Sequence, residues 1–519
     1  MIKVFNNPAE AEKIVKQEFS IPPFLMMENA AKFTADFIIK KKVKKVIILC
    51  GKGNNGGDGF AISRLLCTYD KNIDITLLVS ELPASQEAKT QFEICKKLKI
   101  PAKIKNQVLP FITNFFCNKS DFQKTQSFTD DFLIFSKNET AIIDCLFGTG
   151  FHGELSAEHK QIFDILNSTK SLKIACDIPS ALYFNADFTI TMGIYKTSLF
   201  SDKAKNVCGK IILADLGLPR RIFESFTVPD AFLTEKSDLQ LPYRTKKSSH
   251  KGTYGHACIF ACQKSGAGII AASAAVNFGS GLTSVLQTEN SNLSQFKISP
   301  ELMICTTIPK KTNAVLFGSG FEGEAIPNSV FSSVLKWAES TENPGIVLDA
   351  GIFNCNNFCS FLQNLCKNQN AKIVLTPHLS EFNKLILKIK ENVLNSGNCD
   401  FFPFGDDDFS VKTLAENAEQ KIAVIKYFIK LYPAVTLIVK SANTFIASES
   451  QIFICNNGTQ NLAKGGSGDV LAGMTVSLLA QGYSAKNAAL NAVQAHAAAS
   501  KKFGAKAFNL TPKKLIKLL

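Results

Sequence analysis

Short apolar runs that lead directly into loops rich in glycine or aspartate recur along the whole chain. Lys45–Cys50 (KVIILC) leads into Gly51–Gly59, and Thr140–Leu146 leads into Phe147–Gly150. Segments with helical spacing separate these runs. Continuous apolar runs of this length are typical of strands buried on both faces of a parallel sheet. The alternation therefore predicts doubly wound α/β layers in both halves of the chain.

The length of the chain predicts more than one domain. A chain of 519 residues exceeds what one hydrophobic core usually supports. The segment Arg220–Lys251 changes character, because it holds Pro229, Pro242 and the polar, basic run Arg244–Lys251. Such a segment is typical of a linker. We predict a first domain at 1–220, a linker at 221–250 and a second domain at 251–519.

The composition limits the class of protein and of partner. Hydrophobic residues make up 46% and charged residues 20%, which describes a folded protein. The net charge of +14 suits an anionic partner such as a phosphate-rich small molecule. Lys/Arg blocks interleaved with aromatic residues are missing from the sequence, so a nucleic acid is disfavoured as partner.

Cysteine usage and hydropathy favour the cytoplasm. The 15 cysteines are scattered without a Cys-x-x-Cys pair, so we interpret them as reduced, apolar side chains. Met1–Glu10 lacks the apolar segment of a signal peptide, and no run approaches the roughly 20 apolar residues of a membrane span. We therefore expect a cytoplasmic protein without a membrane partner.

The stretch Lys464–Gly473 (KGGSGDVLAG) predicts an anion site with a built-in base. Its glycines allow several N–H groups to converge, and the apolar run that follows has helical spacing. Asp469 lies in the middle of this site. A carboxylate beside a phosphate is suited to take a proton from a hydroxyl next to the phosphoryl group. The alternative is a plain glycine-rich turn with Asp469 as helix N-cap.

The loop Gly51–Gly59 (GKGNNGGDG) predicts a second phosphate site, with a helix expected from Phe60 to about Tyr69. Its spacing is not that of the dinucleotide fingerprint, and it lacks the Gly-Lys-Ser/Thr ending of a Walker loop. Asparagine and aspartate oxygens in the loop suggest a cation beside the phosphate. A tight strand-to-helix turn is the alternative.

Three aspartates follow or end neighbouring strands of the first half. They are Asp58, Asp144 and Asp177. Because the carboxyl ends of parallel strands meet at one edge, we expect the three to surround one pocket. For any one of them, capping a loop is an equally good interpretation.

The remaining expected elements complete both halves. In the first half they are a helix over residues 10–40 interrupted at Pro22-Pro23, a strand Ile73–Val79, a helix Ser85–Leu98, a strand in Leu172–Ser180 and an irregular insertion Asn106–Asn138. In the second half they are strands His256–Cys262, Ala314–Phe317, Ile346–Ala350, Lys372–Thr376 and Val435–Lys440, with Ala-rich helices from Gly266 to Phe278 and from Ser484 through His496.

The motifs of the first half resemble the epimerase domain of the nicotinamide-nucleotide repair proteins. The resemblance rests on GKGNNGGDG (51–59), DCLFGTG (144–150) and DIPS (177–180), and it covers about residues 1–220. It implies a Rossmann-like three-layer sandwich that interconverts the R and S epimers of hydrated NADH and NADPH. Two positions differ from the family pattern, Ala181 in place of glycine and Met192 in place of an aromatic residue.

The resemblance also implies site residues. The implied substrate contacts are Asn54, Asn55, Gly56, Gly57, Asp58, Gly148, Thr149, Gly150, Phe151, His152, Gly153 and Glu154, and also Asp177. Asn55, Asp144 and Ser180 are implied to hold a potassium ion (K⁺). We assign Asp177 the acid/base role.

The second half resembles the nicotinamide-nucleotide hydrate dehydratases, which have a ribokinase-like three-layer fold. The ordered motifs are GAG (266–268), GSG (318–320), LDA (348–350), TPH (376–378) and GGSGDVLAG (465–473). The implied substrate contacts are Ala267, Gly320, His378 and Asp469, and the implied contacts to the phosphoryl donor are Lys440, Ser441, Ala442, Asn443, Thr444 and Gly468.

This resemblance implies a chemical role for Asp469. It would take the proton from the C6 hydroxyl of the hydrate as that oxygen attacks the terminal phosphoryl group, after which phosphate leaves. Mg²⁺ is expected with ADP or ATP, and the fused arrangement favours ADP. Three positions depart from the pattern: Asn443 in a segment usually richer in glycine, Gly351 in place of a second aspartate, and Leu379-Ser380 in place of Pro-Gly.

We therefore predict a bifunctional repair enzyme for hydrated NAD(P)H, active on small molecules and forming a homo-oligomer. Two alternatives remain. A ribokinase-like kinase for a vitamin precursor explains residues 465–473 but not the first half, and it would make a stable phosphorylated product. A non-catalytic dinucleotide sensor would bind without turnover, against which the intact Asp177 and Asp469 argue.

Overall fold

The computed structural model describes residues 1–519 except 70–72, 118–138, 152, 226, 396–402 and 505–506. The chain divides into two compact units. The N-terminal unit comprises Lys3–Leu199 and Lys203–Pro229, and the C-terminal unit comprises Met1–Ile2, Phe200–Asp202 and Asp230–Leu519. The segment expected as a linker, 221–250, is partly folded, because its strand β10 (Ala231–Leu233) pairs in parallel with β19 (Gln451–Cys455).

The N-terminal unit is built on a seven-stranded sheet in which all neighbours are parallel. Its order is β4-β3-β2-β5-β6-β7-β9. The strands are β2 (Lys45–Cys50), β3 (Asp74–Val79), β4 (Ala102–Ile104), β5 (Thr140–Cys145), β6 (Leu172–Cys176), β7 (Phe188–Met192) and β9 (Lys210–Ala214). A further strand, β1 (Ile2–Phe5), pairs in parallel with β8 (Tyr195–Lys196).

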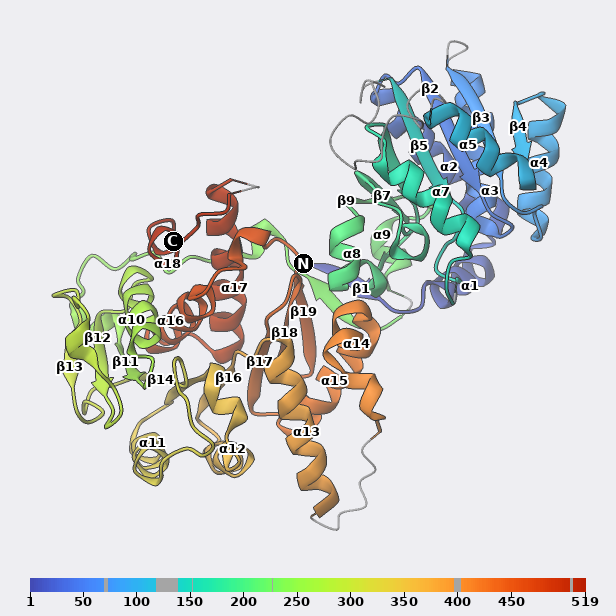
Figure 1. Cartoon of the computed structure of the whole chain (residues 1–519). Helices are drawn as coiled ribbons and strands as arrows, with labels where there is room; N and C mark the ends of the chain where they lie inside the picture. The colour runs from blue at the N-terminus through green and yellow to red at the C-terminus, as the bar shows by residue number, and fades with distance from the viewer. Residues whose placement is uncertain (70–72, 118–138, 152, 226, 396–402, 505–506) are drawn as a thin grey trace. The chain divides into compact units, whose positions relative to one another are not determined.

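Helices cover both faces of this sheet (Figure 1). The helices of this unit are α1 (Pro8–Phe19), α2 (Pro23–Lys40), α3 (Asn54–Tyr69), α4 (Gln86–Lys97), α5 (Val108–Phe116), α7 (Ala157–Ser168), α8 (Asp202–Val207) and α9 (Arg220–Phe223). Side chains of β2 alternate between two cores, as a period of two requires. Val46 and Ile48 pack with the helices α2, α3 and α4, whereas Ile47 and Leu49 pack with α5 and α7. The three-layer arrangement predicted from the sequence is confirmed.

The C-terminal unit contains a larger sheet in the order β13-β12-β11-β14-β15-β16-β17-β18-β19-β10. The strands not yet named are β11 (His256–Ala261), β12 (Leu282–Gln287), β13 (Met303–Cys305), β14 (Ala314–Phe317), β15 (Gly345–Leu348), β16 (Lys372–Leu375), β17 (Val435–Val439) and β18 (Thr444–Ser448). Pairing is parallel from β13 to β17 and antiparallel from β17 through β19.

Helices again lie on both faces of the sheet, with α10, α16 and α17 on one and α11, α12 and α13 on the other (Figure 1). The helices are α10 (Ser265–Asn277), α11 (Asn328–Ser340), α12 (Phe358–Cys366), α13 (Leu379–Asn395), α14 (Val411–Glu416), α15 (Ala418–Leu431), α16 (Ser467–Ala480), α17 (Ala485–Lys502) and α18 (Pro512–Ile516). Alanines and glycines dominate the α10–α16 contact, and an added Cβ at Gly473 would lie 2.1 Å from the Ala271 carbonyl oxygen. The two helix backbones therefore touch.

Two expectations about local structure were wrong. Helix α3 begins at Asn54 rather than at Phe60, so most of the expected loop is the first turn of the helix. An added Cβ at Gly56 would lie 1.9 Å from the Gly51 carbonyl oxygen, which shows that glycine serves close packing here. The expected irregular insertion contains α5, whose apolar residues pack into the core; residues 118–138 lie outside the described residues.

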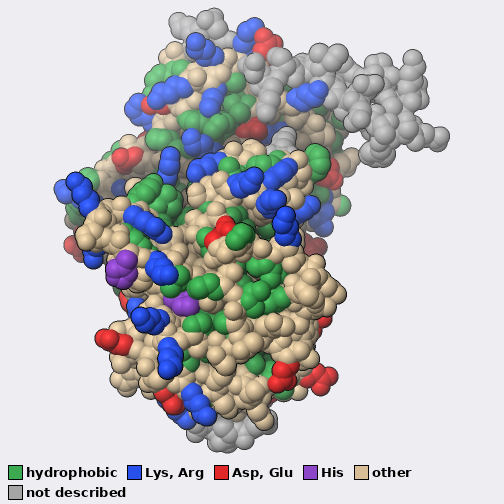
Figure 2. Space-filling view, turned by 90° about the vertical axis from the view of Figure 1, so that its left-hand side faces the viewer, with side chains coloured by type: hydrophobic (Ala, Val, Ile, Leu, Met, Phe, Trp, Pro, Cys, Tyr) green, Lys and Arg blue, Asp and Glu red, His purple; other side chains and the backbone are tan. Residues whose placement is uncertain are grey.

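The surface and the thiols agree with the composition. On the face in Figure 2, Lys and Arg side chains are spread among neutral ones, with few Asp and Glu. Cysteines within the described ranges form no disulfide. In the same ranges, the structure contains no helix whose length and hydropathy would let it cross a bilayer.

Candidate active sites

A cavity of about 740 Å³ opens at the carboxyl edge of the N-terminal sheet. Its walls come from the loops after β2, β3, β5 and β6, from the ends of β7 and β8, and from α1 and α7. Strand order reverses between β2 and β5, because the chain runs outward to β4 and then returns to the other side of β2. Ligands of doubly wound folds bind at such a switch point. The volume suits a small organic ligand.

An ion pair between Asp177 and Lys196 lies in the wall of this cavity. Asp177 follows β6 with a left-handed backbone (φ 68°), and its N–H donates to the Ile190 carbonyl at 2.7 Å. Only 3% of the Lys196 side chain is exposed. Burial lowers the pKa of Lys196 to about 8, against the opposing effect of nearby carboxylates. Asp177 is thus held as a hydrogen-bond acceptor beside an ammonium group that is almost completely shielded from solvent.

Two further carboxyl groups face Lys196. Burial, reinforced by Glu12, raises the pKa of Asp58 to about 8. Burial also raises the pKa of Glu12, which lines the cavity from α1. At neutral pH, Asp58 therefore keeps its proton, whereas the Asp177 carboxylate is paired with Lys196, so the cavity holds both a donor and an acceptor.

Asp144 lies beneath the cavity and supports it. It is fully buried, and its carboxylate accepts from the Ser180 hydroxyl at 2.6 Å and the Ser180 N–H at 2.8 Å. Burial raises the pKa of Asp144 to about 6 despite these bonds. At the start of α3, both side-chain polar atoms of Asn55 are buried without a hydrogen-bond partner. A bound cation would satisfy the oxygen of such an amide.

The other expected residues of this site divide into two groups. The cavity is lined by Asn54, Asn55, Asp58, Gly148, Thr149, Gly150, Phe151, Glu154 and Asp177. Gly56 and Gly57 are buried inside α3, Gly153 is exposed, and His152 lies outside the described residues. Met192 lines the cavity, and Ala181 adopts a left-handed backbone (φ 53°), which explains why the family prefers glycine there.

In the C-terminal unit, Asp469 lies in the first turn of α16. The N-cap residue Gly466 has φ 87°, and an added Cβ there would lie 2.6 Å from Pro512 Cγ. Burial raises the pKa of Asp469 to about 6; the charge of Asp349 adds to the increase, while a hydrogen bond from Ser319 opposes it. The GSG loop and the glycine-rich loop, far apart in sequence, therefore meet at Asp469.

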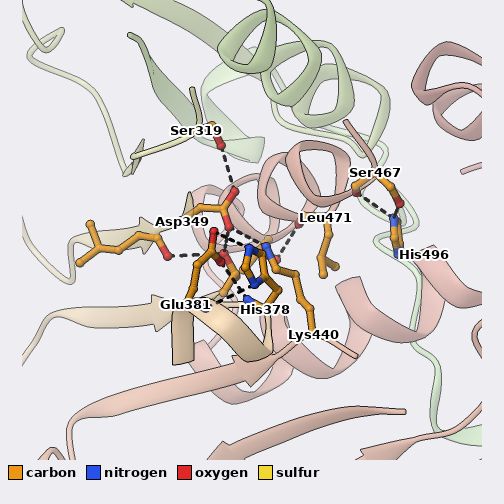
Figure 3. Close-up of polar contacts among 11 residues, drawn as sticks. Ser319, Asp349, His378, Glu381, Lys440, Ser467, Leu471 and His496 are labelled. Carbon is orange, nitrogen blue, oxygen red and sulfur yellow. Dashed lines mark hydrogen bonds and ion pairs between the residues drawn. The ribbon is translucent and has the colours of Figure 1, made fainter. Parts of the chain in front are cut away.

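Asp349 organises the polar network shown in Figure 3. Its carboxylate accepts from Lys440 Nζ at 2.8 Å, from Thr376 Oγ1 at 2.6 Å and from Ser319 Oγ at 3.1 Å. These partners follow β17, β16 and β14, so one buried carboxylate after β15 joins four strand ends. Asp349 and other carboxylates raise the pKa of Lys440 against the opposing effect of burial, which keeps its ammonium charged.

His378 forms a local pair with Glu381 at the edge of this network (Figure 3). His378 Nε2 lies 3.1 Å from Glu381 Oε1, and the His378 N–H donates to Glu381 Oε2 at 2.8 Å. The His378 side chain is 54% exposed, whereas that of Glu381 is 12% exposed. The imidazole is therefore accessible to a ligand and oriented by a carboxylate.

The expected donor segment forms the turn between β17 and β18. Lys440 reaches the glycine-rich loop, because an added Cβ at Gly468 would lie 3.3 Å from Lys440 Nζ. Asn443 is buried, and its amide donates to the Phe200 carbonyl at 2.9 Å within the same unit. Ser441 Oγ donates to the Asn443 carbonyl at 2.6 Å, and Ala442 is exposed. The Asn443 side chain thus braces the turn.

The remaining expected positions also converge. An added Cβ at Gly320 would lie 3.1 Å from the Ala267 Cβ, so the GAG and GSG loops touch. At Gly351 an added Cβ would lie 1.9 Å from the Phe321 carbonyl oxygen, so this backbone excludes the aspartate that the family pattern has there. His496, interpreted as structural, is buried with Nε2 3.1 Å from the Ser467 carbonyl oxygen.

Family models match both halves of the chain. The model described as NAD(P)H-hydrate dehydratase matches residues 258–519, and the one described as YjeF-related protein N-terminus matches residues 24–198. A bifunctional NAD(P)H-hydrate repair enzyme Nnr of Helicobacter pylori is 34% identical over 99% of both chains. The chain belongs to the bifunctional NAD(P)H-hydrate repair enzymes.

Further similar proteins include two relatives and one solved structure. The Nnr protein of Dictyoglomus turgidum is 27% identical over 98% of this chain and 95% of its own. An NAD(P)H-hydrate epimerase of Elusimicrobium minutum is 33% identical over 41% of this chain and 94% of its own. The Bacillus subtilis ADP/ATP-dependent NAD(P)H-hydrate dehydratase, crystallised with ATP/Mg²⁺, is 22% identical over 53% of this chain and 91% of its own, with a TM-score of 0.39.

The family motifs did not reveal every residue of the two sites. Glu12 lies on α1, outside every glycine loop, and no sequence signal singled it out. Lys196 ends the short strand β8, so a charged residue at a strand end was the available signal. Asp349 lies within the LDA motif and follows a strand, as Asp177 does, and could have been found by that rule.

Proposed function

We propose that this repair enzyme epimerises hydrated NAD(P)H in the cavity of its N-terminal unit and dehydrates the S epimer at Asp469. Full-length similarity to bifunctional repair enzymes supports the pair of activities. The observation that carries the assignment of sites is that each unit brings a buried aspartate and a lysine together at the carboxyl ends of its parallel strands.

Epimerisation requires the C6–O bond of the hydrate to break and a new one to form on the other face. The leaving oxygen takes up one proton, and the incoming water gives one up. Asp58, which keeps its proton at neutral pH, supplies the donor, and Asp177, paired with Lys196, supplies the acceptor. Water in the open cavity returns the proton from Asp177 to Asp58, so the cycle balances.

We propose K⁺ as the cation of the epimerase site. Asn55 with its unpartnered amide oxygen, the Asp144 carboxylate and the Ser180 hydroxyl are the groups that would hold it. Such an ion supplies positive charge next to the bound anionic substrate. Within the described residues no group of three His, Cys, Asp or Glu side chains forms a site for a transition metal. The neutral oxygens of Asn55 and Ser180 instead fit a weakly bound hard cation.

For the dehydration, Asp469 accepts the proton of the C6 hydroxyl, because at neutral pH a carboxyl with a pKa of about 6 is ionised. The oxygen then bonds to the terminal phosphorus of ADP or ATP, and the bond to the nucleotide breaks. Amides at the start of α16 and the Lys440 ammonium next to Gly468 stabilise the transferring group. Finally the C6–O bond breaks, phosphate leaves and the neighbouring ring carbon loses a proton, which restores the double bond.

Roles at the margins of this site are also proposed. Ala267, Gly320 and His378 contact the hydrated dinucleotide, and the turn Lys440–Thr444 together with Gly468 contacts the donor. Mg²⁺ accompanies the donor and is bound mainly through phosphate oxygens and water. ADP is the favoured donor. The homo-oligomeric state is a prediction that sedimentation velocity would measure.

The decisive experiment follows the conversion of a mixture of R and S hydrated NADH by absorbance of the reduced nicotinamide. It is run with ADP, with ATP and without a donor. Complete conversion with one donor establishes both activities and identifies that donor. Conversion that stops at the S fraction leaves the epimerase assignment without support. No conversion with either donor refutes the repair function.

A further inference from the structure

The cavity of the N-terminal unit extends well beyond its proposed reaction centre. In sheet order, Glu81 follows β3, Asn54 follows β2, Gly148 follows β5 and Asp177 follows β6, and all four line the cavity. Neighbouring strands lie about 4.8 Å apart, so the ends of β3 and β6 are separated by about 14 Å. Glu81 therefore lies at the end of the cavity remote from Asp177.

The start of helix α3 lies between these two ends. Helix α3 begins at Asn54, in the loop after β2, and its first N–H groups point to the carboxyl edge of the sheet. The start of a helix attracts phosphate. With the hydrated nicotinamide at Asp177 and the pyrophosphate at α3, the adenosine half of the dinucleotide extends toward β3 and Glu81.

Glu81 is fixed at that remote end. Its Oε2 lies 3.2 Å from Lys52 Nζ, with 46% of the Glu81 and 61% of the Lys52 side chain exposed. The loop after β3 is tied to the glycine loop by two backbone bonds, from Ala84 N–H to the Lys52 carbonyl (2.8 Å) and from Ser80 N–H to the Cys50 carbonyl (3.1 Å). A carboxylate in a partly open cavity wall is thus held beside a cation.

The place of Glu81 in the topology indicates what it binds. It follows the second strand of a β-loop-α-β unit, β2-α3-β3, whose first loop leads into the start of α3. In dinucleotide-binding folds a carboxylate at that place hydrogen-bonds the ribose hydroxyls and disfavours a 2′-phosphate. The glycine loop here differs from the dinucleotide fingerprint, but the geometry of strand, helix and strand is the same.

We infer that Glu81 binds the ribose hydroxyls of the adenosine half and makes the epimerase prefer hydrated NADH over hydrated NADPH. The inference rests on the proposed epimerase function and adds its cofactor specificity. A 2′-phosphate at this place meets the carboxylate of Glu81 and competes with it for Lys52. With Glu81 neutralised, Lys52 is free to pair with the phosphate.

The test measures kcat/KM for epimerisation of the purified R hydrates of NADH and NADPH, with the full chain and without ADP or ATP. Chromatography follows the S epimer, so dehydration does not contribute. For the natural protein we expect the NADH hydrate to be preferred. Glu81→Gln shifts the ratio toward the NADPH hydrate by about tenfold or more, because hydrogen bonds to a charged group are lost and a like charge is removed.

Two further variants define the result. Lys52→Gln is expected to shift the ratio further toward the NADH hydrate, because it removes the cation that can pair with a 2′-phosphate. Glu93→Gln is the matched control: this exposed carboxylate on α4 pairs with Lys96 at 2.6 Å and does not line the cavity. If the natural protein epimerises both hydrates and Glu81→Gln leaves the ratio unchanged, this inference is overturned while the proposed function stands. If the natural protein epimerises neither, both fall.

Discussion

Removing the Asp349 carboxylate is expected to destabilise the C-terminal unit strongly. Only 2% of this side chain is exposed, and it is the acceptor for Lys440, Thr376 and Ser319. In Asp349→Ala the Lys440 ammonium, 18% exposed, keeps its charge without its ion-pair partner, and the Thr376 and Ser319 hydroxyls each lose one acceptor. Breaking a buried ion pair by removing one partner costs about 3–5 kcal/mol. Because Lys440 keeps some contact with water, we expect a loss of about 3 kcal/mol in the free energy of unfolding.

The chain offers a specific probe for this measurement. Its single tryptophan, Trp337, is buried in α11 of the C-terminal unit, so its fluorescence reports the unfolding of that unit alone. With a slope of about 2 kcal/mol per M urea, the expected loss shifts the midpoint by about 1.5 M. Asp349→Asn should shift it by roughly half as much, because the amide oxygen still accepts hydrogen bonds.

The control is an exposed pair of the same chemistry. Asp36 lies 3.3 Å from Lys32 on α2, and both side chains are largely exposed. Exposed pairs contribute about 0–1 kcal/mol, and this one belongs to the other unit, so Asp36→Ala should leave the tryptophan transition in place. A midpoint shift below about 0.3 M for Asp349→Ala would refute the role given to this carboxylate.

Three further predictions concern the same unit. Dehydration of the S hydrate should fall as the pH drops through about 6, because Asp469 must be ionised to accept a proton, and Asp469→Asn should slow it about a thousandfold while epimerisation persists. Gly473→Ala should cost about 1–3 kcal/mol in the tryptophan-monitored transition, because its Cβ meets the Ala271 carbonyl, whereas Gly465→Ala, with open space around it, should cost little. Burial lowers the pKa of His496 to about 4, so between about pH 6.5 and 4 only the unfolded chain binds a proton at this histidine. The free energy of unfolding should therefore fall by up to about 1.4 kcal/mol per pH unit in that range. Urea titrations at several pH values measure this slope, which His496→Gln should reduce relative to the natural protein.

The strands and the loops that carry motifs were predictable because burial on both faces leaves a clear sequence pattern. Lys45–Cys50 and Ala314–Phe317 are strands with the bounds expected from their runs of apolar residues. The start of α3 was not predictable from propensity, since glycine and asparagine disfavour helix interiors. Close packing of Gly56 on Gly51 overrides that preference, and such a tertiary contact is invisible in the local sequence.

The site residues also divide into those that a local sequence motif reveals and those that only the folded structure reveals. Asp177 and Asp469 stand in glycine-rich or strand-end motifs, and both were found. Glu12 reaches the cavity from a surface helix, where a glutamate at helical spacing looks like an ordinary solvated residue. Glu81 follows its strand without glycine, so only the order of strands in the sheet reveals that it shares a cavity with Asp177.

The backbone contact between α10 and α16 has a consequence for how this enzyme can change by insertion or deletion. Ala267 lies one turn before Ala271, and Asp469 lies one turn before Gly473, where the two helices touch. One residue added between either loop and the contact would rotate that loop by 100° and advance it by about 1.5 Å relative to the other. The helix contact therefore fixes the rotation and height of the loop that carries Ala267 relative to the loop that carries Asp469. Length changes in α10 and α16 should be tolerated only beyond the contact, toward Asn277 and Ala480.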